Sequence, residues 1–189
     1  MAETNTGDTV AAEDTFRLRV STHIANSPEQ VFNLVSDLRR SAEWSPECVG
    51  GHWVSGTPGA VGSVFAGENH RESDVVSWAP VLRGIFHSEM EVVEASAPRT
   101  FRWAMRDSTG RPQESVWGFD ISPDSDGAQM THTFWMGRLT EGMKKIVTGM
   151  DDAELGQFLD EWGTKIKFDM AQTVARLKDL LESEPGGQG

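Results

Sequence analysis

The sequence predicts an α+β protein in which an antiparallel sheet of about seven strands wraps around one long C-terminal helix. Between residues 16 and 137, stretches with strand-like alternation are separated by short segments rich in Gly, Pro, Ser and Asp. After residue 150, apolar side chains recur every three or four residues over about 30 residues. Short breaks between consecutive strands indicate an antiparallel meander, and such a helix, ~45 Å long, can cross it.

The first elements are a strand and a short helix. Apolar residues and Thr alternate with polar residues over 16–24, as in a half-buried strand. Ser27 then provides an N-cap, Pro28 the first helical residue and Gln30 the partner of a capping box. An apolar stripe from Val31 to Leu38 completes a short helix, and a second short turn or helix leads to Trp44.

Six further strands and the long helix follow. The strands are expected near residues 48–54, 61–71, 84–94, 99–106, 114–122 and 128–137. Residues 138–150 contain Gly142 and Gly149 and have no clear period, so we expect an irregular flap there. The long helix begins at Asp151 or Asp152, and its apolar face runs to Leu181.

Composition excludes several classes of function. The chain has 17 Lys and Arg against 29 Asp and Glu, a formal charge of −12, with no basic patch, so nucleic acid is not an expected partner. There is no Tyr, which removes phenol chemistry from any mechanism. Cys48 is the only cysteine and we expect it to pack as a small side chain; a nucleophilic role is the alternative. A single thiol fits a reducing cytoplasm.

The ends of the chain differ from its body. Residues 1–14 are acidic, with neither a basic nor an apolar run, so we expect a disordered lead and no signal peptide or membrane span. Residues 184–189 read as a flexible tail. We expect residues 15–183 to form one domain of a cytoplasmic protein that does not bind membranes, either a monomer or a homodimer.

Strand alternation selects the candidate catalytic residues. Phe65, Asn69 and Arg71 share one face of their strand, which we expect to be concave, so that Asn69 orients a ligand carbonyl and Arg71 lies near the mouth. The alternative for Asn69 is a hydrogen bond to neighbouring backbone. His132 lies on the apolar face of the last strand, where an imidazole can transfer protons; the alternative is a hydrogen-bonded core residue.

The same reasoning selects a substrate-binding set, because large side chains on adjacent strands could stack a flat ligand; ordinary core packing is the alternative. The set is Phe65, Ser88, Met90, Trp103, Met105, Trp117, Phe119, Phe134 and Trp162. The other histidines have no metal-ligand spacing, and nucleophile elbows, phosphate loops and dinucleotide fingerprints are absent from the sequence, so we expect no metal and no cofactor.

Several motifs in order resemble a known family. They are Ser-Pro-Glu-Gln-Val-Phe at 27–32, Glu-Trp-Ser-Pro-Glu-Cys at 43–48, Val-Gly-Ser-Val-Phe-Ala-Gly-Glu-Asn at 61–69, Pro98-Arg99 and Val-Ala-Arg-Leu-Lys at 174–178. Over residues 15–183 the chain resembles the START-like (SRPBCC) superfamily, in particular actinobacterial polyketide cyclase/dehydrase-like members. This resemblance implies a Bet v 1-type helix-grip fold with a central hydrophobic cavity. Residues 70–86 depart from the family pattern.

Relatives of this kind bind lipids, sterols and plant hormones, cyclise or dehydrate polyketides, or act as co-chaperones and resistance proteins, so three hypotheses remain. The first is a cyclase, aromatase or dehydratase of antibiotic biosynthesis, in which His132 shuttles a proton while Asn69 and Arg71 hold a carbonyl. The second is a non-catalytic carrier or self-resistance protein for a hydrophobic ligand. The third is a protein-interaction module.

Overall fold

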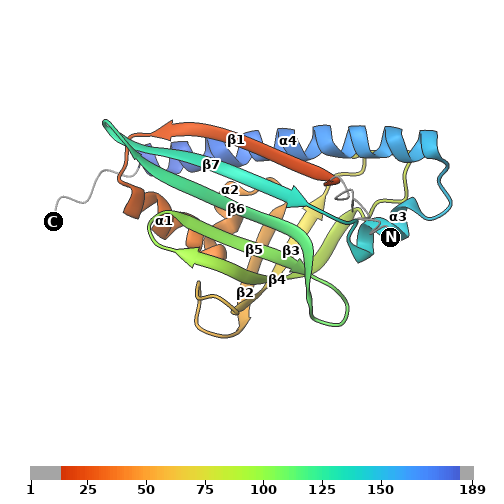
Figure 1. Ribbon diagram of the computed structural model, residues 1–189, viewed down its shortest axis with the longest axis horizontal. Helices are drawn as coiled ribbons and strands as arrows, with labels where there is room; N and C mark the ends of the chain where they lie inside the picture. Colours follow the sequence, from red (N-terminus) through yellow and green to blue (C-terminus); the bar gives the residue numbers. More distant parts are fainter. Residues whose placement is uncertain (1–13, 184–189) are drawn as a thin grey trace, which may run out of the picture.

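The computed structural model describes residues 14–183 and has a seven-stranded antiparallel sheet with one long helix packed against it (Figure 1). The strands are β1 (Phe16–Ile24), β2 (Cys48–Ser55), β3 (Val64–Arg71), β4 (Gly84–Ser96), β5 (Thr100–Arg106), β6 (Pro112–Asp124) and β7 (Gly127–Met136). Their order across the sheet is β1-β7-β6-β5-β4-β3-β2. The predicted meander and all seven strands are confirmed.

The helices are α1 (Pro28–Ser36), η1 (Leu38–Arg40, a single 3₁₀ turn), α2 (Ser41–Trp44), α3 (Glu141–Val147) and α4 (Asp152–Ser183). The predicted capping box is present, because the backbone nitrogen of Gln30 donates to Ser27 Oγ and the backbone nitrogen of Ser27 donates to Gln30 Oε1. The 32 residues of α4 extend ~48 Å, and the helix lies alongside β1 over the length of the sheet (Figure 1). None of these described helices is apolar enough over a sufficient length to cross a membrane.

The prediction of an irregular flap at 138–150 was wrong for its central part. Residues 141–147 form α3, which begins where Thr140 Oγ1 accepts a hydrogen bond from the backbone nitrogen of Met143. Met143 is buried in the core, and this contact holds the short helix in place. A helix of two turns shows too little periodicity to be seen in the sequence, so its stability comes from tertiary packing.

The core lies between the concave face of the sheet and α4, and it has two parts. The α1-side core contains the C-terminal half of α4 (Val174, Leu177 and Leu181) with Phe65, Trp103, Phe119 and residues of α1 and α2. The α3-side core contains the N-terminal half of α4 (Phe158, Trp162, Ile166 and Met170) with Phe16, Phe134 and Met143. Trp117 and Val20 pack against both parts.

The connection between β3 and β4, which lies in the segment that departs from the family pattern, covers the α3-side core. Ala79 and Val81 are buried there. The guanidinium of Arg83 holds the connection in shape by donating to the carbonyl oxygens of Val75, Val76, Ala79 and Val81. Trp78 ties it to α4, because its Nε1 donates to Glu161 Oε2 at 2.9 Å.

The predicted lead and tail fall largely outside the described residues, which begin at Asp14 and end at Ser183. Asp14, assigned to the lead in the sequence, pairs with Arg17 and accepts a hydrogen bond from Trp135 Nε1 at 2.8 Å.

Candidate functional site

A row of rings crosses the concave face over β5, β6 and β7. Cross-strand pairing places Trp117 opposite both Trp103 and Phe134, and Phe119 opposite His132. The Phe119 and His132 rings stack with centroids 4.4 Å apart, and Trp117 stacks on Phe134 at 4.1 Å. The face predicted to be concave on these three strands is confirmed.

His132 is 3% exposed and neutral. Its Nδ1 lies 2.9 Å from the carbonyl oxygen of Gly118, so Nδ1 carries the proton and donates it to that acceptor. Burial lowers the pKa of His132 to about 4, against the opposing effect of the Gly118 hydrogen bond. At neutral pH the imidazole therefore lacks an acidic proton to give to a substrate, and only its Nε2 lone pair is free for chemistry.

Asn69 makes the backbone hydrogen bond of the alternative hypothesis for it, and its role toward a ligand carbonyl stays a prediction. Its Nδ2 donates to Ser88 Oγ on β4 at 3.0 Å and to the carbonyl oxygen of Gly67 at 3.4 Å. Gly67 leaves room for this pair, because a Cβ there would lie 3.3 Å from Met90 Cε and 3.5 Å from Ser88 Oγ. Asn69 and Ser88 are both half-buried, so this polar pair interrupts an apolar surface that solvent can reach.

Arg71 is at the end of β3, and each of its three guanidinium nitrogens donates a hydrogen bond. Nε and Nη2 donate to the two carboxylate oxygens of Glu47 at 2.7 and 2.9 Å, and Nη1 donates to the carbonyl oxygen of Leu82 at 3.0 Å. The guanidinium carbon lies 4.6 Å from the Phe86 ring centroid and 4.9 Å from that of Trp162. A ligand carbonyl would therefore meet a paired cation rather than a free one.

Three charged residues that sequence reasoning missed complete a group with Arg71, which we call the Glu47 cluster: Glu47, Arg71, Lys165 and Asp169. The Lys165 ammonium pairs with Glu47 and lies 2.5 Å from Asp169 Oδ2. Lys165 and Asp169 are four residues apart on α4, a spacing visible in the sequence, whereas Glu47 lies in the connection between α2 and β2.

The pKa values of the two carboxyl groups of the cluster are shifted in opposite directions. Burial acts to raise the pKa of Glu47, but the Arg71 hydrogen bond and the Lys165 charge outweigh it, and the pKa lies below the usual value. Burial raises the pKa of Asp169 above its usual value, and the charge of Lys165 offsets this only in part. The cluster thus contains one strongly ionised carboxylate and one that accepts a proton more readily.

The predicted substrate-binding residues divide by burial. Phe65, Trp103, Phe119, Phe134 and Trp162 are at most 8% exposed and pack within the two cores, so side chains occupy the deep part of the expected cavity. Ser88, Met90, Met105 and Trp117 are half-buried. Together with Asn69 they lie on the inward face of β3–β6, with Met90 paired opposite Met105, and we call this set of five residues the concave patch.

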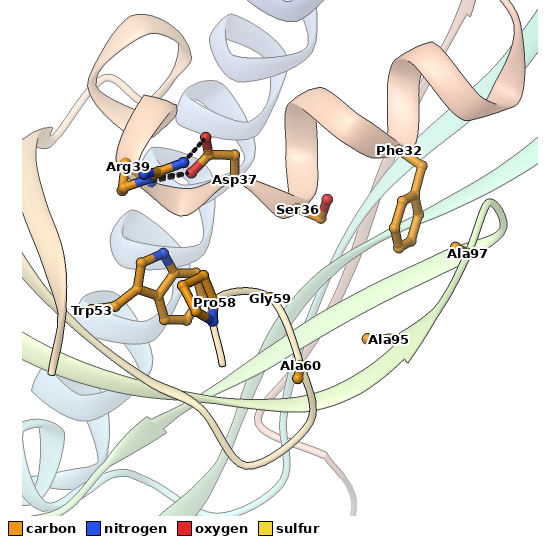
Figure 2. A pocket seen from close by; sticks show the side chains of 10 residues that line it. All are labelled: Phe32, Ser36, Asp37, Arg39, Trp53, Pro58, Gly59, Ala60, Ala95 and Ala97. Carbon is orange, nitrogen blue, oxygen red and sulfur yellow. Dashed lines mark hydrogen bonds and ion pairs between the residues drawn. The ribbon is translucent and has the colours of Figure 1, made fainter. Parts of the chain in front are cut away.

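A separate pocket of about 510 Å³ opens between α1, the β2–β3 connection and the end of β4 (Figure 2). Its lining residues are Phe32, Ser36, Asp37, Arg39, Trp53, Pro58, Gly59, Ala60, Ala95 and Ala97. None of these was selected from the sequence, because they come from distant segments that only the fold brings together.

The described part of the chain has no cluster of metal-binding side chains. Within residues 14–183, His, Cys, Asp and Glu side chains nowhere gather in a group of three that could hold a metal ion. Cys48 is half-buried and lies 3.0 Å from Ser41 Oγ, with its thiol donating to the carbonyl oxygen of Gly50.

A family model described as polyketide cyclase/dehydrase and lipid transport matches residues 15–182. The chain belongs to this family. The resemblance found in the sequence motifs is therefore confirmed over almost the whole described chain. No curated protein sequence matches the chain.

Solved structures of this polyketide cyclase/dehydrase family type share the fold. A polyketide-cyclase-like protein from Corynebacterium glutamicum matches with a TM-score of 0.61 and 22% identity, over 91% of this chain and 94% of that one. The di-domain ARO/CYC StfQ of the steffimycin biosynthetic pathway matches with a TM-score of 0.62 and 8% identity, over 88% of this chain and 50% of StfQ. The di-domain ARO/CYC BexL of the BE-7585A biosynthetic pathway matches with a TM-score of 0.61 and 15% identity, over 90% of this chain and 51% of BexL. At these identities the likeness concerns the helix-grip fold.

Proposed function

We propose that this member of the family binds a hydrophobic, oxygen-bearing small molecule on the concave patch and acts on it as a cofactor-independent cyclase or dehydratase of the polyketide type. The observation that carries the proposal is the Asn69–Ser88 hydrogen bond within a half-buried apolar surface. Ligand sites combine a mostly apolar lining with a few placed polar groups that fix orientation. Met90, Met105 and Trp117 supply the apolar lining.

Ring closure of a poly-carbonyl chain needs a base to remove a proton from carbon and a donor to the carbonyl oxygen on which charge develops. In this proposal Ser88 supplies the donor, because its hydroxyl group accepts a hydrogen bond from Asn69 Nδ2 and keeps its own proton for the carbonyl oxygen. Two groups have the chemistry to move the proton: the Nε2 lone pair of neutral His132, and the carboxyl group of Asp169, whose pKa burial raises. The Arg71 guanidinium packs over the Trp162 ring, and its charge is balanced by Glu47.

A non-catalytic carrier or self-resistance protein is the second candidate, and a specific observation favours it. The guanidinium of Arg71 is engaged by Glu47 and Leu82, and His132 is neutral, so binding needs no titrating group. Either function suits a cytoplasmic role in antibiotic biosynthesis, which stays a prediction, as does the choice between monomer and homodimer.

The test is incubation of the protein with a linear poly-β-ketone thioester, followed by mass spectrometry of the products. Catalysis yields a cyclised product lighter by one water, formed faster than without protein. Asn69→Leu should slow this conversion at least tenfold, while His87→Leu, on the exposed face of β4, should not. A carrier returns the thioester unchanged and protected from spontaneous cyclisation. If the protein neither binds nor converts the thioester, both candidates are contradicted.

A further inference from the structure

We propose that the pocket between α1, the β2–β3 connection and the end of β4 is a second small-molecule site, for an uncharged flat aromatic molecule that carries a hydrogen-bond-accepting oxygen. The pocket shares no lining residue with the concave patch, so this proposal does not depend on the proposed function. Its volume of about 510 Å³ is within the ~300–1,000 Å³ range of small-molecule sites.

The shape of the pocket suits a flat ring. Phe32 and Trp53 form aromatic walls, and each is fixed by an edge-to-face contact with the core, Phe32 on Phe101 at 6.2 Å and Trp53 on Phe65 at 5.3 Å. The remaining apolar lining consists mainly of small residues, with Ala95 and Ala97 at the end of β4 and Gly59 and Ala60 in the β2–β3 connection (Figure 2). Rigid aromatic walls with small residues between them leave a slot for a planar group.

Gly59 is required for this shape. Its φ of +76° lies in the left-handed region, where any other residue would be strained. The same residue approaches the end of α1, because a Cβ built on it would lie 3.6 Å from the carbonyl oxygen of Ser36. The β2–β3 connection is thereby held beside α1 without filling the space between them.

An unpaired donor indicates the chemistry of the ligand. Trp53 Nε1 is buried and has no hydrogen-bond partner among the described residues. A buried donor left without an acceptor destabilises the free protein, and a ligand acceptor removes that cost. In Figure 2 the nitrogen-bearing edge of the Trp53 ring points toward the side of the pocket where Asp37 and Arg39 lie. A ligand oxygen inserted there would accept this hydrogen bond.

The charges at the rim favour an uncharged oxygen over a carboxylate. Arg39 is bound to Asp37 through two hydrogen bonds, Nε to Oδ1 and Nη2 to Oδ2, both at 2.8 Å. The Arg39 hydrogen bond holds the pKa of Asp37 below its usual value, so this carboxylate stays ionised. The pair is neutral as a unit, so it offers no net positive charge to compensate an incoming anion for the loss of its hydration. A phenol or ketone oxygen needs no such compensation.

The experiment is titration of ¹⁵N-labelled protein with 2-naphthol, following the indole N–H signals of the seven tryptophans by NMR. The Trp53→Phe variant assigns the Trp53 signal. We expect this signal to move downfield in a saturable manner, as a newly hydrogen-bonded N–H does, and 2-naphthoate to bind at least tenfold more weakly. Binding at the concave patch would instead move the Trp117 signal, so the two sites are distinguished in one titration.

Ala95→Leu fills the pocket, and we expect it to weaken 2-naphthol binding at Trp53 at least tenfold. Val93→Leu, at an exposed position of the same strand, is the matched control and should bind as the wild type does. The remaining indole signals show whether each variant is folded, and Ala60→Leu fills the pocket from the β2–β3 connection if Ala95→Leu is not. An unmoved Trp53 signal at millimolar 2-naphthol, or unchanged binding in a folded pocket-filling variant, would overturn the proposal.

Discussion

His132 lies face to face with Phe119 on the neighbouring strand, at an interplanar angle of 15°, and donates through Nδ1 to the carbonyl oxygen of Gly118, the residue before Phe119. Burial holds the imidazole in its neutral form, while the hydrogen bond to Gly118 acts in the opposite direction and fixes the orientation of the ring. The histidine is therefore part of the core and, through its Nε2, part of the proposed site. The two roles are separable by experiment, because the first sets stability and the second sets activity.

The stability role predicts a pH effect that His132→Phe removes. The folded pKa of about 4 lies below the usual value near 6.5, so between these values the unfolded chain binds a proton that the folded chain does not. The free energy of unfolding therefore falls as the pH drops from 7 to 4.5, with a contribution of roughly 2–3 kcal/mol from this group. Urea unfolding at both pH values should show a smaller fall in the variant. Equal falls in the two proteins would contradict the buried, neutral histidine.

Phe119 should be among the most costly core residues to remove. It is fully buried and contacts the rings of Trp44, Trp103 and His132. Phe119→Ala leaves a cavity and should lower the free energy of unfolding by about 3–5 kcal/mol. Phe168→Ala is the control, because Phe168 on α4 is 63% exposed and its removal should change stability by less than about 0.5 kcal/mol. Similar losses in both variants would argue against the packing described.

Long periodic elements were the predictable part of this fold. Each strand is seven or more residues long, and the buried face of α4 extends from Phe158 to Leu181, so these elements are long enough to be identified from the sequence. Alternation also assigned the correct face to Trp103, Phe119 and His132, because one face of each strand is buried. The short helix α3 has no comparable signal, and packing of Met143 determines it.

The polar part of the candidate site was less predictable because its contacts are long-range. Asn69 and Arg71 were identified by their face on β3, but the partner of Arg71 is Glu47, 24 residues away. Lys165 reaches the same carboxylate from 118 residues further along the chain. Local patterns indicate that a side chain faces inward, whereas its charge partner depends on how α4 and the α2–β2 connection meet.

Removal of the Glu47 carboxylate should destabilise the contact between α4 and the α2–β2 connection. Glu47→Gln leaves the Arg71 guanidinium without its anion and the Lys165 ammonium with Asp169 alone, and both cationic side chains are less than 20% exposed. We expect a loss of about 1–3 kcal/mol in the free energy of unfolding at pH 7. Glu89→Gln is the control, because Glu89 pairs with Arg106 while 51% exposed, where an ion pair contributes about 0–1 kcal/mol. Equal losses would show that the Glu47 cluster is no stronger than a surface pair.

Asp169 should respond to pH in the opposite sense to Glu47. Because burial raises its folded pKa, the stability linked to its protonated form is present below the usual aspartate pKa and is lost as the pH rises through the folded value. Asp169→Asn keeps an uncharged side chain at every pH. The variant should therefore gain stability relative to the wild type as the pH rises from 3.5 to 7, measured by urea unfolding. A relative loss over this range would mean that the ionised carboxylate is stabilised by Lys165.

Ligand binding on the concave patch is the central claim, and one calorimetric comparison tests it. A hydroxylated anthraquinone is titrated into three proteins that all carry Ala95→Leu, which fills the second pocket. They are this parent, the parent with Ser88→Leu and the parent with His87→Leu, which alter adjacent residues on opposite faces of β4. Ser88→Leu removes the hydroxyl group bonded to Asn69 and fills the patch, whereas His87 is exposed on the convex face. We expect saturable binding to the parent, the same affinity with His87→Leu and at least tenfold weaker binding with Ser88→Leu. Undiminished affinity with Ser88→Leu, or no binding to the parent, would contradict the claim.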